Sequence, residues 1–249
     1  MIRKKILNPT SSLLEGFDDV GTPDMKYYAF DWDDNIMMMP TKIIVKDEND
    51  NEVGMSTEDF AEYRSEIGVE PFDYKGSKIV GYSDEPFRNF RTGGDKQFKI
   101  DAMKGKPGPA WSDFVEAINN GSIFSIITAR GHNPETIKDA IYNLIISDHM
   151  GINKDLLIKN LRKFRDLSNM EDKSDMELIK DYMDMNKYYP VSFGTDAGAA
   201  NPEELKVQAM KEFISYVKGQ AKELGKKLYV KDDVNNNFVP VLVTGSANF

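Results

Sequence analysis

The chain contains no cysteine, which excludes disulfide bonds and thiol chemistry and is compatible with a reducing compartment. No stretch reaches the roughly 18 consecutive apolar residues of a membrane-spanning helix, and the N-terminal residues lack the apolar segment of a signal peptide. We therefore expect a soluble, cytoplasmic protein that does not bind a membrane. The only histidines, His132 and His149, are too few and too far apart to indicate a zinc site.

The chain also lacks a net positive charge. Its 249 residues carry a formal net charge of −9, which argues against binding nucleic acid or an anionic membrane over the whole surface. Apolar side chains, 40% of the total, suffice for a substantial core, and the length suits one large domain or a core with an inserted module. Residues 1–25, with several glycines and prolines, are predicted to form an N-terminal arm.

The most informative stretch is residues 26–35, an aromatic, β-favouring run that ends in three carboxylates. Such a run predicts a buried strand, and ligands bind at the strand ends of open α/β sheets. Asp31 and Asp33 stand two positions apart, so their repulsion at the strand end favours a cation or a proton held between them. We therefore expect Mg2+ here, with one carboxylate able to attack phosphorus and the other to handle the leaving-group proton.

This stretch also resembles a known motif. Asp31-Trp32-Asp33-Asp34-Asn35 looks like the first motif of the haloacid-dehalogenase-like (HAD) superfamily, Asp-x-Asp-x-Thr/Val after a hydrophobic strand. Asn35 departs from it, because Thr or Val is usual at that position.

A second apolar run, residues 122–128, predicts a parallel strand that is buried on both faces and ends at Thr128. A helix capped by Asn133 follows, and the backbone amides at its start can hold an anion. The sequence Ile-Thr-Ala-Arg-Gly resembles the second HAD motif, whose hydroxyl hydrogen-bonds the transferring phosphoryl group. We expect Arg130 to bind substrate, while His132 is either a substrate contact or a plain loop histidine.

Residues 41–108 are too many for a simple loop and predict an insertion, which the HAD resemblance identifies as a cap over the active site. Within it, residues 75–106 hold eight basic and four acidic side chains, a net charge of +4. Such a patch favours an approaching phosphate, but a solvated surface around a small aromatic core explains it equally well. Arg88 and Arg91 flank a Gly-Gly loop that can wrap an anion, so we expect both to bind substrate.

The resemblance further implies a lysine that balances the carboxylates and an acidic residue after a later strand. Lys173 suits the lysine best, with Lys163 and Lys180 as rivals. Asp196 follows the apolar run 188–193 and matches the fourth HAD motif. The family commonly shows two acids there, whereas Ala-Gly-Ala-Ala follows Asp196. One carboxylate suffices for Mg2+, but the loss of the second lowers the expected metal affinity.

Further elements follow from periodicity and capping signals. Helices are predicted at residues 56–63, 112–119 (capped by Ser112) and 201–225, and strands at 41–46, 156–158, 227–230 and 239–243. The acidic stretch 232–237 indicates a hairpin turn rather than a metal loop. Together with the resemblance, these elements predict a doubly wound, Rossmann-like parallel α/β core of the HAD type, formed by residues 26–40 and 109–249 and carrying a cap at 41–108.

The resemblance implies a Mg2+-dependent phosphatase that acts on a small phosphorylated substrate through an aspartyl-phosphate intermediate. Asp31 would be the nucleophile, and Asp33 would protonate the leaving oxygen and then activate water. Thr128 and Lys173 would stabilise the phosphoryl oxygens. Asp31, Asp33 through its backbone carbonyl, and Asp196 would hold the metal.

Two other functions stay open. Asn35 and the single acid at Asp196 favour a binding or scaffold protein that keeps the fold without the chemistry. The basic, aromatic insertion favours action on nucleotide or nucleic-acid ends, which salt-dependent oligonucleotide binding would reveal.

Overall fold

The structure, a computed structural model, describes residues 5–6, 27–165, 173–195, 201–228 and 241–242. Most of the predicted arm, the stretch 232–237 and Asp196 lie outside these ranges. The fold is mixed α/β.

The central sheet has the strand order β1-β11-β2-β9-β10. Its centre is a parallel unit of β2 (Tyr27–Phe30), β9 (Ile123–Thr128) and β10 (Lys187–Pro190). The two-residue strand β11 (Val241–Leu242) lies parallel to β2, and β1 (Lys5–Ile6) lies antiparallel to β11. Every residue of β9 is buried, which confirms the prediction of a strand covered on both faces.

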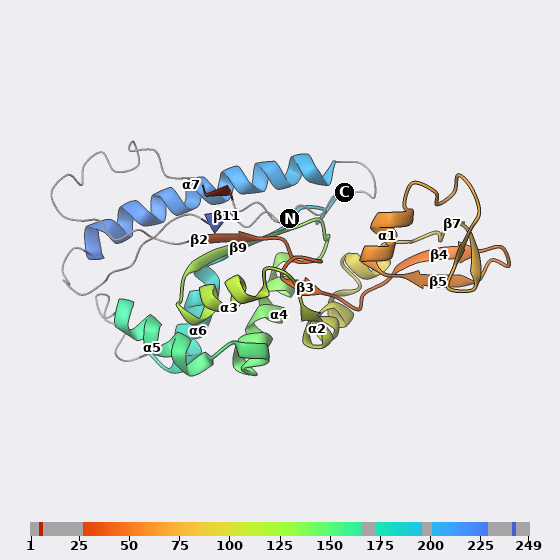
Figure 1. Cartoon of the computed structure of the whole chain (residues 1–249). Helices are drawn as coiled ribbons and strands as arrows, with labels where there is room; N and C mark the ends of the chain where they lie inside the picture. The colour runs from red at the N-terminus through yellow and green to blue at the C-terminus, as the bar shows by residue number, and fades with distance from the viewer. Residues whose placement is uncertain (1–4, 7–26, 166–172, 196–200, 229–240, 243–249) are drawn as a thin grey trace.

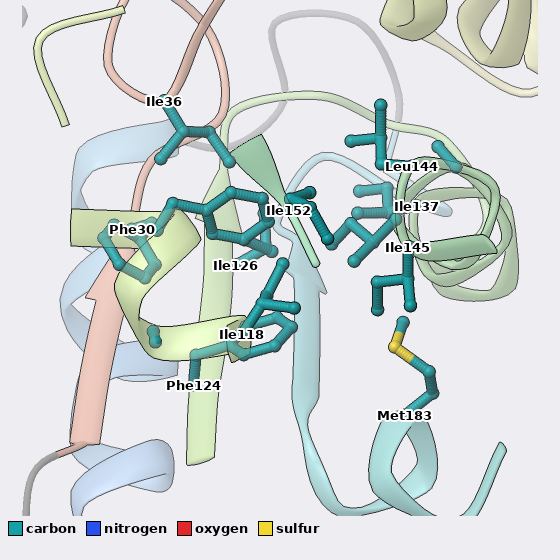
Figure 2. Packing of buried hydrophobic residues seen from close by; sticks show 14 of the residues in the cluster. Phe30, Ile36, Ile118, Phe124, Ile126, Ile137, Leu144, Ile145, Ile152 and Met183 are labelled. Carbon is teal, nitrogen blue, oxygen red and sulfur yellow. The ribbon is translucent and has the colours of Figure 1, made fainter. Parts of the chain in front are cut away.

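Helices cover both faces of this sheet (Figure 1). On one face, α7 (Pro202–Leu228) packs Ala209, Phe213 and Val217 against Ala29, Ile123 and Ile127. The other face is covered by α3 (Trp111–Asn119), α4 (Pro134–Ile146), α5 (Lys154–Arg165) and α6 (Asp175–Met185). Figure 2 shows this larger cluster, in which Phe30, Phe124 and Ile126 of the strands lie near Ile118, Ile137 and Ile145 of the helices. Because successive strand side chains point to opposite faces, β2 and β9 supply both clusters.

A second, antiparallel sheet of order β5-β4-β7-β6 lies to the right of the central sheet in Figure 1. It consists of β4 (Ile43–Asp47), β5 (Glu52–Met55), β6 (Phe72–Tyr74) and β7 (Ser77–Tyr82), and α1 (Thr57–Tyr63) packs with it. Its own buried cluster contains Val45, Met55, Ile67, Tyr74 and Ile79. Residues 43–82 therefore bury apolar side chains among themselves.

Two connections join this sheet to the rest of the chain. We call residues 39–42 the outgoing connection and residues 83–107 the returning connection. The returning connection contains η2 (Arg88–Phe90), α2 (Asp95–Lys104) and β8 (Lys106–Pro107), which pairs with β3 (Met37–Met38). Phe98 and Ala102 of α2 belong to the main core cluster, so this part of the predicted insertion packs against the main core.

Three predictions of local structure are wrong. Residues 156–158 belong to helix α5, whose Leu157, Ile158 and Leu161 face the core, because a short apolar run does not distinguish a strand from a buried helix. Residues 227 and 228 continue α7 and form no strand. Helix α3 begins at Trp111 with Ala110 as its N-cap, so Ser112 does not cap it.

A short 3-10 helix, η3 (His149–Gly151), follows α4. No helix among the described residues is long and apolar enough to cross a membrane.

Candidate active site

Asp31 lies directly after β2, at the carboxyl end of the parallel unit. Its Oδ2 is 2.5 Å from Nζ of Lys206 on α7, and its Oδ1 accepts the backbone N–H of Trp32 at 2.7 Å. Burial raises the pKa of Asp31, although the ammonium of Lys206 acts in the opposite direction. The mostly buried carboxylate and its lysine thus form a polar pair between the strand end and the helix that covers the sheet.

Asp33 is held by a single arginine. Nε of Arg130 donates to its Oδ2 at 2.8 Å, and Nη2 donates to its Oδ1 at 2.7 Å. The arginine side chain is only 1% exposed and that of Asp33 15%. This two-point geometry fixes the carboxylate in direction as well as in place.

Thr128 ends β9, the strand next to β2. It is buried, and its Oγ1 accepts the backbone N–H of Arg130 at 3.3 Å. Because β2 and β9 run parallel, Asp31 and Thr128 lie at the same edge of the sheet.

The turn after Asp33 reaches towards the antiparallel sheet. Asp34 adopts the left-handed conformation with φ 55°, which Asp tolerates better than most residues. Oγ1 of Thr57, in the first turn of α1, donates to Asp34 Oδ1 at 3.0 Å. Burial raises the pKa of Asp34, and this hydrogen bond opposes the shift. Asn35 is buried, and its Oδ1 has no hydrogen-bond partner among the described residues.

The two arginines expected in a substrate-binding loop have different surroundings. Arg88 makes a bidentate pair with Glu52 of the antiparallel sheet, at 2.8 and 2.6 Å. Arg91 instead docks beside the strand ends, because its backbone bridges Gly131 and its Nη1 donates to the carbonyl of Thr195 at 3.3 Å. The Arg91 side chain therefore reaches the described parts of the loops that follow β9 and β10.

The lysine expected opposite Asp31 is elsewhere. Nζ of Lys173 pairs with Asp181, two turns along α6, at 2.5 Å. The partner of Asp31 is Lys206, which sequence reasoning missed. A signal for it was present: a helix that starts at Pro202, after the third parallel strand, places its first turns at the strand ends, and Lys206 lies about one turn into it.

The residues present offer Mg2+ suitable donors but not a complete cage. Carboxylate and carbonyl oxygens are its preferred ligands, and Asp31 and the carbonyl of Asp33 supply them. No group of three or more acidic or histidine side chains that could hold a metal occurs within the described ranges, and Asp196 is outside them. The donor chemistry fits Mg2+, with Lys206 as a competitor for Asp31.

Half of the basic side chains in the stretch 75–106 are paired with acidic neighbours. Lys75, Lys78, Arg88 and Lys99 each lie within 4 Å of a carboxylate, those of Asp59, Glu48, Glu52 and Asp139. The positive field of this stretch is therefore weaker than its sequence suggests.

Comparisons with protein families, curated proteins and solved structures give no match to this chain.

Proposed function

We propose that the chain is a Mg2+-dependent phosphomonoesterase with a HAD-like, doubly wound core, in which residues 41–108 act as the cap. The observation that carries the proposal is the pair of Asp31 and Lys206 at the end of β2, with Thr128 at the end of the neighbouring parallel strand. A carboxylate nucleophile, a cation and a hydroxyl at one sheet edge are the groups that phosphoryl transfer requires.

In the proposed reaction, an oxygen of Asp31 attacks phosphorus and the bond from phosphorus to the ester oxygen breaks. Asp33 gives its proton to the leaving oxygen, and then takes a proton from the water that hydrolyses the aspartyl phosphate. Lys206 and Thr128 stabilise the phosphoryl oxygens, so Lys206 takes the role that the resemblance implied for Lys173. Mg2+, held by Asp31, the Asp33 carbonyl and Asp196, would supply further positive charge at this site.

The arrangement around Asp33 also allows the binding or scaffold function. Both of its oxygens accept from Arg130, while Asp31 is paired with Lys206, so the two carboxylates are neutralised within the protein. Action on nucleic-acid ends has less support, because half of the basic side chains of residues 75–106 are paired with carboxylates.

The test is phosphate release from an aryl phosphate with and without Mg2+, for wild type, Asp31→Asn, Lys206→Met and Lys206→Arg. We expect Mg2+-dependent turnover that Asp31→Asn abolishes, and a loss of about 10²- to 10³-fold in kcat for Lys206→Met with partial rescue by Lys206→Arg. Hydroxylamine should trap the acyl phosphate on Asp31 of the wild type, as detected by peptide mass spectrometry.

Matched controls exist for both substitutions. Asp139→Asn changes an exposed aspartate paired with Lys99, and Lys211→Met changes an exposed lysine on the same helix as Lys206. Both should retain wild-type turnover. A wild type that neither binds Mg2+ nor releases phosphate would instead favour the binding or scaffold function.

A further inference from the structure

Arg130 has an environment that binding of a substrate does not explain. Its side chain is 1% exposed, and its donors are directed at protein atoms. Besides the two bonds to Asp33, Nη1 lies 3.3 Å from Nε2 of His132, and Nη2 donates to Oγ1 of Thr41 at 3.3 Å. The rings of Phe90 and Phe98 flank the guanidinium, with centroids 4.5 and 4.8 Å from its Cζ.

The groups around Arg130 are themselves anchored. Nδ1 of His132 is 3.1 Å from Oδ1 of Asp95, which also accepts the hydroxyl of Thr136 at 2.9 Å. The hydroxyl of Thr41 donates to Oδ2 of Asp101 at 2.8 Å. Fixed partners on several sides leave the guanidinium one orientation, because a buried charge that loses its partners is strongly destabilising.

These partners come from both connections to the antiparallel sheet. Thr41 belongs to the outgoing connection, and Phe90, Asp95, Phe98 and Asp101 belong to the returning connection. The backbone of the returning connection is also hydrogen-bonded to the loop of Arg130, since Gly131 donates to Phe90 and accepts from Thr92. Neither connection can move without changing the contacts of Arg130.

We propose that Arg130 is a positioning residue. It aims the carboxyl group of Asp33 at the leaving oxygen only while both connections keep their contacts with the Arg130 side chain. This inference rests on the proposed function for the proton transfer by Asp33. The clamp leaves that chemistry possible, because each carboxyl oxygen has two lone pairs and Arg130 occupies one on each. The contact of the insertion with the main core and the orientation of the Asp33 carboxyl group are thereby coupled through the side chain of Arg130.

The coupling predicts a dependence on the leaving group. An alkyl phosphate needs a proton at its leaving oxygen, whereas a nitrophenyl phosphate leaves as a stable anion and needs little help. Arg130→Lys retains the charge but loses the planar fork. We expect it to lower kcat for an alkyl phosphate by about 10²-fold or more and for nitrophenyl phosphate by about tenfold or less, with KM unchanged.

A second variant acts at a distance from Asp33. Thr41→Val keeps the side-chain shape and removes the hydroxyl that accepts from Arg130, so it should lower kcat for the alkyl ester about tenfold and leave the nitrophenyl ester unaffected. The control is Arg162→Lys, which alters an arginine–carboxylate pair with Asp175 between α5 and α6. The control should not distinguish the two esters.

A measurement that does not depend on turnover completes the test. In 15N spectra of the arginine side chains, the Nε–H of Arg130 should exchange slowly with solvent in the wild type and faster in Thr41→Val. Equal losses for the two esters in Arg130→Lys, or unchanged exchange in Thr41→Val, would overturn the inference. If the wild type hydrolyses neither ester, the proposed function fails, and the exchange rates alone decide whether the connections hold Arg130.

Discussion

At the scale of single residues, the surroundings of His132 determine its protonation state. Its side chain is completely buried and lies between Arg130 and Asp95, and its ring is tilted by 35° against that of Phe98 with the centroids 4.7 Å apart. Burial, together with the nearby charge of Arg130, lowers the pKa of His132 to about 4, although Asp95 acts against this shift. A neutral imidazole accepts from Arg130 at Nε2 and donates to Asp95 from Nδ1.

A pH dependence of stability follows. The pKa of His132 is lower in the folded protein than its ordinary value of about 6.5, so the unfolded chain binds the proton more tightly between these values. The stability contributed by the neutral imidazole is complete above pH of about 6.5 and is lost as the pH falls towards about 4. We expect this residue alone to reduce the free energy of unfolding by about 2 kcal/mol between about pH 7 and pH 5.

The measurement is urea unfolding at both pH values for wild type and His132→Gln. The glutamine has no group that titrates in this range, so the variant should show a smaller decrease in stability on acidification. Burial raises the pKa of Asp95, but hydrogen bonds from the Gly93 amide, Thr136 and His132 bring it below its ordinary value. Asp95 therefore titrates at a lower pH than His132 does in the unfolded chain. Equal decreases in wild type and variant would contradict the prediction.

The sequence predicted the strand-end positions of a carboxylate and a hydroxyl, but not the partners of these side chains. Asp31 and Thr128 were predictable because each follows an apolar run whose end must reach a sheet edge. The pair of Asp31 and Lys206 joins residues 175 positions apart, and lysines are common on surface helices, so only the place of Lys206 about one turn into the helix that starts at Pro202 could have favoured it over Lys173. The burial of Arg130 could not be predicted from the sequence either, because it depends on the rings of Phe90 and Phe98 from a distant segment.

At the scale of elements, the loop after β2 is fixed by close backbone packing. Gly108, directly after the returning connection, crosses this loop, and its amide donates to the carbonyl of Ile36 at 3.1 Å. An ideal Cβ at Gly108 would lie 2.3 Å from the carbonyl oxygen of Asn35. The glycine therefore permits the approach of two backbones that holds the carboxylate loop in place.

Gly108→Ala should be severely destabilising, because the new methyl group meets backbone that cannot rotate away. We expect a loss of more than about 2 kcal/mol in the free energy of unfolding, measured by urea denaturation. Gly81→Ala in β7 is the matched control, since its Cβ would meet no atom within 4 Å and its cost should be small. Similar midpoints for the two variants would show that the loop and the connection separate more easily than this packing implies.

At the scale of the whole molecule, the antiparallel sheet and the central sheet have separate apolar clusters. The sheet of residues 43–82 buries Val45, Met55 and Ile79, whereas α2 in the returning connection contributes Phe98 to the main core. The sequence predicted an insertion at residues 41–108 from its length, but no pattern in it indicated that Phe98 joins the main core. The polar contacts of Arg130 and Asp34 link the two parts near the site.

Separate clusters imply that the antiparallel sheet opens on its own. Ile79 is a fully buried member of this cluster, so Ile79→Ala should destabilise residues 43–82 by about 2 to 4 kcal/mol. Native-state hydrogen exchange should show faster exchange of the amides in β4 and β7, with little change in β9, because local openings of this kind stay within one cooperative unit. Ile137→Ala, in the main cluster, is the matched substitution and should accelerate exchange in β9. If Ile79→Ala accelerated exchange in both sheets equally, the molecule would unfold as one unit, and the seating of the insertion on Arg130 would be as stable as the core itself.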